Sequence, residues 1–69
     1  MKVSIDLEAD ALLIQFRKGR SAKTIELDKD TNLDLDAKGL PLAIEMLNVT
    51  QKIPIKELRS IDVSLPIKR

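Results

Sequence analysis

Apolar and polar residues alternate in short runs along most of the chain, and a period of two is typical of strands that bury one face. The pattern is clear at residues 2–6, 24–27 and 31–36. Residues 11–16 are apolar at nearly every position, which favours a strand in the interior of a sheet. Because 43% of the residues are apolar and a single one is aromatic, the core must consist of Ile, Leu and Val, which suit a pleated surface. The sequence therefore predicts a mainly antiparallel β-sheet.

Turn-forming residues separate these runs. An acidic stretch at residues 6–10 closes the first pair of strands, because aspartate bonds its own backbone. Residues 36–39 begin with aspartate and end with glycine, which is typical of a type I turn with a glycine bulge. A basic stretch around Gly19 is interpreted as another hairpin tip, and a fifth strand is expected at residues 40–49. Consecutive strands should therefore be neighbours in a meander.

The last third of the chain departs from this pattern. Pro54 suits the first turn of a helix, and Ile55 and Leu58 lie on one side of it at a spacing of three, so a short helix is expected at about residues 54–60. Beyond it the alternation returns, which predicts a short final strand that Pro66 weakens or keeps at an edge.

The expected fold class is α+β, mainly antiparallel β: a five-strand meander plus one short helix and a short C-terminal strand. All 69 residues are expected to form one domain, with the meander at residues 1–50 and the helix and last strand at residues 51–69. A core of this size barely offsets the entropy of ordering the chain, and the sequence lacks cysteine and histidine for disulfides or the usual metal sites. We therefore expect a homo-oligomer or a complex with a small protein partner, in which the helix or a second copy covers one face of the sheet.

The C-terminal segment carries more apolar side chains than a short helix and strand bury alone. These residues are the candidate partner interface: Ile53, Ile55, Leu58, Ile61, Val63, Leu65 and Ile67. An edge strand in this segment would add to another sheet through main-chain hydrogen bonds. The equal alternative is that the segment completes the chain's own core.

The residue types present argue against catalysis. Without histidine, cysteine or tyrosine, general acid–base chemistry falls to carboxylates and lysines, which need burial to titrate near neutral pH. No serine has a candidate base near it in sequence, so neither an enzyme nor a cofactor is expected. Residues 28–34 begin like a calcium loop, but leucine and glycine occupy the positions of its glycine and closing glutamate. The acidic segment at residues 28–36 is therefore interpreted as a turn and strand, with Asp34 and Asp36 facing water.

Nucleic-acid binding is the alternative function. The candidate contacts form a basic cluster on the expected hairpin tip: Arg17, Lys18, Arg20 and Lys23. Such cations bind phosphates in a salt-dependent way. The cluster contains no aromatic residue that stacks on bases, and the net charge of the chain is +1, so this binding is expected to be weak.

A cytoplasmic protein without membrane association is expected. No run approaches the roughly 20 apolar residues that a bilayer-spanning helix needs. The first six residues already include an acid, unlike a signal peptide.

Four short motifs, taken in order, resemble those of a known family. They are an acidic turn at residues 6–12, a strand at residues 24–27, an Asp-Leu-Asp strand end followed by Gly39, and a strand at residues 44–47. Their order and spacing resemble the DUF2283 family of small prokaryotic β-rich proteins over about residues 2–50. Ile5 and Leu13 stand where the family commonly has tyrosine.

The resemblance implies a compact β-rich domain without an established activity. Some relatives are suspected of being antitoxin-like partners of small toxins. The first interpretation of the chain is therefore a non-enzymatic protein-interaction module, and its antitoxin-like version follows from the resemblance alone.

Overall fold

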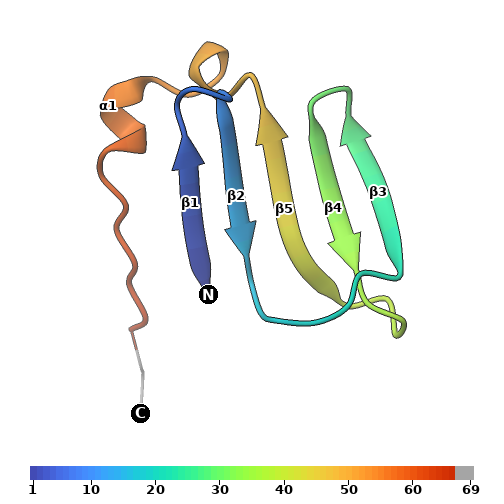
Figure 1. Cartoon of the computed structure of the whole chain (residues 1–69). Helices are drawn as coiled ribbons and strands as arrows, with labels where there is room; N and C mark the ends of the chain where they lie inside the picture. Colours follow the sequence, from blue (N-terminus) through green and yellow to red (C-terminus); the bar gives the residue numbers. More distant parts are fainter. Residues whose placement is uncertain (67–69) are drawn as a thin grey trace.

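In the computed structural model, which describes residues 1–66, five antiparallel strands form one sheet with a short helix beyond it (Figure 1). The order of the strands across the sheet is β1-β2-β5-β4-β3. Their bounds are β1 (Lys2–Asp6), β2 (Ala11–Gln15), β3 (Lys23–Asp28), β4 (Thr31–Leu35) and β5 (Pro41–Leu47). The predicted five-stranded antiparallel sheet is confirmed, and the apolar run at residues 11–16 lies in the interior of the sheet as expected.

The strands do not follow one another as a meander. Hairpins join β3, β4 and β5, but β2 pairs with β5 instead of β3. The connection at residues 16–22 crosses the lower end of the sheet in Figure 1 and carries the chain to the opposite edge. The order β2-β5-β4-β3 is that of a Greek key. The predicted meander order is therefore wrong, because a period of two fixes which side chains share a face but not which strands pair.

The crossing connection is held at both ends and passes close to the sheet. The Phe16 N–H donates to the Leu42 carbonyl at 2.7 Å, and the Ala22 N–H donates to the Leu35 carbonyl at 2.8 Å. A β-carbon added at Gly19 would lie 2.6 Å from Cδ2 of Leu42. A side chain at position 19 would therefore have to displace the buried Leu42 side chain, against which the backbone lies.

Aspartates close the turns between adjacent strands. Oδ1 of Asp6 accepts two backbone N–H bonds at 3.0 Å in the β1–β2 turn, and Oδ1 of Asp28 accepts one at 2.8 Å in the β3–β4 turn. In the β4–β5 turn, Oδ1 of Asp36 accepts two such bonds, and Gly39 has a φ of 82°. The predicted glycine-bulge turn is confirmed.

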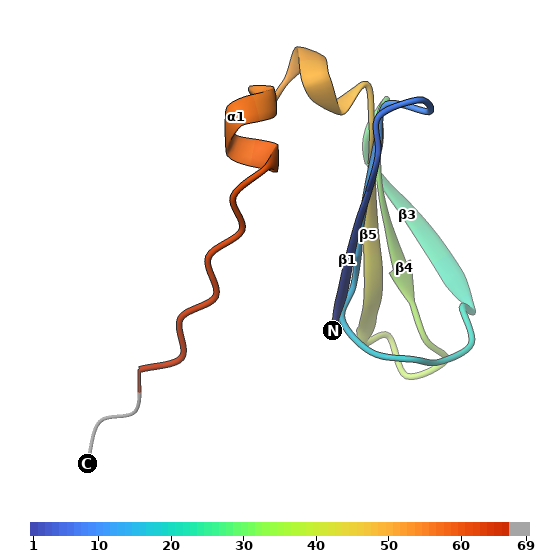
Figure 2. The ribbon, with the colours of Figure 1, turned by 60° about the vertical axis from the view of Figure 1, so that its left-hand side comes forward.

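After β5 the chain leaves the sheet. Asn48 takes a left-handed conformation with φ 53°, a 3-10 helix η1 (Val49–Gln51) follows, and helix α1 (Ile55–Leu58) begins after Pro54. The predicted short helix is confirmed, whereas the 3-10 helix was not anticipated. The predicted C-terminal strand is not found at residues 61–66, because no strand lies beside them to supply ladder hydrogen bonds (Figure 2). The remaining positions of the expected strand, residues 67 and 68, lie outside the described residues.

The register of the strands separates an apolar face from a more polar one. One row crosses all five strands and is wholly apolar, and a second apolar row lies beside it on β1, β2 and β5. We call these eight side chains the apolar face: Val3, Ile5, Leu12, Ile14, Ile25, Leu33, Ile44 and Met46. The opposite face includes Ser4, Leu13, Gln15, Asn32 and Glu45.

The core of the described chain is small. Among residues 1–66 the buried apolar side chains are Leu12, Leu42 and Val49. Helix α1 and the segment after it stand to one side of the sheet without extended contact with any strand, so no second layer is formed by residues 1–66 (Figure 2). The sequence led us to expect that either the helix or a second copy covers one face of the sheet. The helix does not cover it.

Candidate functional site

The basic cluster predicted as a nucleic-acid contact lies on the crossing connection and the start of β3, not on a hairpin tip. Arg17, Lys18, Arg20 and Lys23 are all exposed. The hairpin interpretation was wrong because β2 and β3 lie at separate places in the sheet. The sequence pattern of a turn between two strands is the same whether or not those strands pair.

A hollow of about 420 Å³ lies between the crossing connection and the β4–β5 turn. Arg17, Gly19 and Arg20 line it from the connection. The turn contributes Asp36, Ala37, Lys38 and Leu40. Lys18 and Lys23, the other two members of the predicted cluster, are not part of this lining.

One cation of the hollow is already paired. The Arg17 guanidinium donates to a carboxylate oxygen of Asp36. The backbone N–H of Leu40, together with Arg17, holds the pKa of the Asp36 carboxyl below its usual value. Because Arg17 is neutralised, the positive charge that the hollow offers to an anion comes from Arg20 and Lys38.

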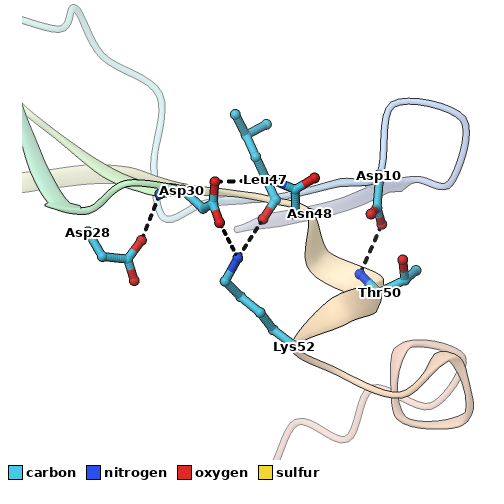
Figure 3. A network of polar contacts seen from close by, with 7 residues as sticks. All are labelled: Asp10, Asp28, Asp30, Leu47, Asn48, Thr50 and Lys52. Carbon is cyan, nitrogen blue, oxygen red and sulfur yellow. Dashed lines mark hydrogen bonds and ion pairs between the residues drawn. The ribbon is translucent and has the colours of Figure 1, made fainter.

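A second polar network lies at the other end of the sheet (Figure 3). Nζ of Lys52 lies 2.6 Å from Oδ2 of Asp30 and donates to the Leu47 carbonyl at 3.1 Å, while Nδ2 of Asn48 donates to Oδ1 of Asp30 at 3.1 Å. The hydrogen bond from Lys52 lowers the pKa of Asp30. These contacts tie the segment after β5 to the β3–β4 turn.

Asp10 makes the matching connection to the β1–β2 turn (Figure 3). Its Oδ1 accepts the Thr50 N–H at 2.9 Å, and its carbonyl accepts the Val49 N–H at 3.1 Å. Asp10 was expected to bond its own neighbours, but its partners lie about 40 residues away. The Asp10–Thr50 and Asp30–Lys52 contacts were not predicted from the sequence. One local signal for the turn after β5 was present, since asparagine, here Asn48, tolerates the left-handed conformation.

The acidic segment at residues 28–36 is occupied by structural contacts. Asp28 closes its turn, and the N–H of Asp30 lowers the pKa of the Asp28 carboxyl. Oδ1 of Asp34 accepts the hydroxyl of Thr24 at 2.7 Å. Asp34 and Asp36 are half-buried, and each also forms hydrogen bonds within the chain, which the sequence did not predict. In the part of the chain that the structure describes, no three His, Cys, Asp or Glu side chains group as metal ligands would.

The candidate partner interface divides into two parts. Ile53 and Leu58 are half-buried, and Ile55 is exposed on α1. The segment after α1, residues 60–66, follows an irregular extended path and is called the arm (Figure 2). The arm exposes Ile61, Val63 and Leu65, so these side chains do not contribute to a core within residues 1–66. Ile67 lies outside the described residues.

The fold and its polar contacts define a class of small, mostly β proteins built on a single five-stranded Greek-key sheet. The model of the family described as protein of unknown function (DUF2283) matches residues 2–49, well over half of the chain, and the chain belongs to this family. The match covers the whole sheet and ends in η1, so α1 and the arm lie beyond it. No curated protein and no solved structure was found to match the chain. None of the helices in residues 1–66 has the length and apolar character needed to cross a membrane.

Proposed function

We propose that the protein is a non-enzymatic protein-interaction module whose arm contacts a partner protein. The observation that supports this is the exposure of three large apolar side chains on one short segment: 56% for Ile61, 81% for Val63 and 85% for Leu65. Grouped apolar side chains left in water typically mark a site of protein–protein contact.

The backbone of the arm suits binding to the edge of a partner's sheet. Among residues 1–66, the backbone groups of residues 61–66 make no hydrogen bond to another part of the chain. An extended peptide with unpaired N–H and C=O groups adds to a sheet edge, and alternate side chains then enter pockets on one side. Ile61, Val63 and Leu65 have this alternate spacing. Pro66, which lacks an N–H, fits the end of such a strand.

A small toxin protein is the partner class that family resemblance suggests. In that version of the proposal, the folded sheet carries the arm, and the arm covers an apolar surface of the toxin. Ordering an extended segment on binding lowers the affinity per unit of buried area but allows a short peptide to cover a large surface.

Affinity capture from the native host with the full chain tagged at its N-terminus tests the proposal. The arm variant Val63→Asp/Leu65→Asp should lose a co-purifying protein at least 10-fold relative to the unaltered chain. The control variant Asp62→Asn/Ser64→Ala changes the polar positions of the same segment and should retain it. Circular dichroism should give the same melting curve for all three chains because the altered side chains are exposed. Equal recovery of every bound protein by the two variants would refute the role of the arm.

Weak nucleic-acid binding is the second candidate, because Arg20 and Lys38 line one hollow beside the crossing connection. Anisotropy titration of a labelled single-stranded oligonucleotide at low salt tests it. The Arg20→Ala/Lys38→Ala variant should weaken binding and reduce its salt dependence. Identical titrations for the variant and the unaltered chain would rule out this hollow as the contact.

A further inference from the structure

The apolar face of the sheet is large and continuous. Its first row, Val3–Ile14–Ile44–Leu33–Ile25, runs from one edge of the sheet to the other. Leu12, on the second row, is buried, whereas the five members of the first row are half-buried or exposed. A sheet with one apolar face ordinarily buries that face against a second layer. Residues 1–66 supply no such layer (Figure 2).

The missing layer must be present whenever the chain is folded. Three buried apolar side chains among residues 1–66 are too few to offset the conformational entropy of a domain of this length. A second layer that is needed for folding must be present whenever the chain is made, and in an equal number of copies. A second copy of the chain meets this requirement without any other gene product.

The dimensions of the face suit a dimer. Five strands about 4.8 Å apart and about six residues long at roughly 3.3 Å per residue give a face of about 480 Å² in plan. Two such faces amount to about 960 Å² in plan, close to the roughly 1,000 Å² at which specific interfaces begin, and the relief of the side chains adds to this area.

The charges on the two faces also favour the apolar face as the dimer interface. No member of the first row is charged, so two copies of the row meet without burying a charge. The opposite face carries Glu45 at its centre, flanked by Leu13 and Asn32 on the neighbouring strands. Pairing through that face would bring two carboxylates together out of water.

We propose that a second copy of the chain packs on the apolar face, so that the two sheets form a two-layer sandwich about 10 Å thick. This dimer is independent of the proposed role of the arm, since it uses none of the residues of the arm. It supplies the core that the single chain lacks.

Cross-linking through single cysteines tests the face, because the sequence contains no cysteine. Ile44 lies at the middle of the central strand and of the first row, and the centres of two faces related by a two-fold axis lie nearest each other. With a short bis-maleimide, the Ile44→Cys variant should give covalent dimer as its main product. The Glu45→Cys variant, one residue along on the opposite face, is the matched control and should give no covalent dimer on a denaturing gel, although it still associates through the apolar face. Equal cross-linking of both variants would refute the proposal.

Light scattering of the purified, unaltered chain provides the second measurement. A mass of twice the chain is expected from 100 μM down to low micromolar concentration. The arm variant Val63→Asp/Leu65→Asp should give the same mass, whereas loss of dimer in that variant would assign the association to the arm and overturn the proposal. A folded monomer in which the Ile44→Cys thiol is unreactive would show that the chain covers its own face and would overturn it as well.

Discussion

Aspartate carboxylates accept backbone hydrogen bonds in the three tight turns of the sheet. Asp6, Asp28 and Asp36 each bond N–H groups two to four residues further along the chain. These bonds replace the ladder hydrogen bonds that the backbone loses where a strand ends. Asp36 combines this role with its ion pair to Arg17, so one carboxylate holds both the β4–β5 turn and the crossing connection.

The β4–β5 turn depends on the backbone conformation of one glycine. Gly39→Ala should lower the free energy of unfolding by about 1 kcal/mol, because a side chain at a positive φ strains the backbone. The strain would be intrinsic, since an added β-carbon meets no atom within 4 Å. Urea denaturation measures the change. Gly39→Asn should lose less because asparagine tolerates this conformation, and equal losses for the two variants would contradict the explanation.

The 3-10 helix η1 is fixed to the end of the sheet from two sides. Asp10 holds it from the β1–β2 turn, and Asp30 with Lys52 holds it from the β3–β4 turn (Figure 3). Val49, the first residue of η1, is fully buried as a result. The chain therefore leaves the sheet from a fixed point at η1, which is held by contacts between residues that lie far apart in the sequence.

Replacing Asp10 should loosen this attachment. Asp10→Ala removes the acceptor of the Thr50 N–H and places alanine at a φ of 54°, which together should cost about 1–2 kcal/mol of unfolding free energy. Hydrogen exchange should also quicken at the Thr50 amide. Asp10→Asn keeps an acceptor oxygen and tolerates the positive φ, so it should behave nearly as the unaltered chain does. Protection of the Thr50 amide that is unchanged in Asp10→Ala would contradict the assignment.

Local patterns in the sequence predicted the strands and turns better than they predicted which strands pair. The period of two gave the strands and the apolar face, and the aspartate–glycine pair at residues 36–39 gave the turn. The predicted final strand is not found at residues 61–66. Alternation of apolar and polar residues there indicates a segment able to form a strand, but a strand also requires a neighbouring strand to bond with. The same limit applies to the candidate sites. The sequence alone pointed to the apolar residues of the arm. It could not predict the Asp30–Lys52 and Arg17–Asp36 contacts, because their residues are too far apart in the sequence for any local pattern to pair them.

Acid should weaken the fold. Asp28, Asp30 and Asp36 have pKa values below the ordinary 3.8. Their contribution to stability is fully present above that ordinary value and is lost as the pH falls from it through the lower values of the folded chain.

The urea midpoint should therefore be nearly constant from pH 7 to about pH 5 and fall between about pH 4 and pH 2. Asp30→Asn removes one of the three carboxylates and should reduce the steepness of this fall. Urea denaturation followed by circular dichroism measures the midpoint at each pH. A fall of equal steepness in Asp30→Asn would mean that the contact with Lys52 does not couple protonation to folding.

The crossing connection has a consequence for the order in which the sheet forms. The β1–β2 hairpin and the β3–β4–β5 unit each need contacts between residues close in sequence, and such contacts form quickly. The pairing of β2 with β5 joins residues about thirty positions apart and must close a much longer loop. We therefore expect the two halves to form first and the β2–β5 seam, which closes the longest loop of the sheet, to form last.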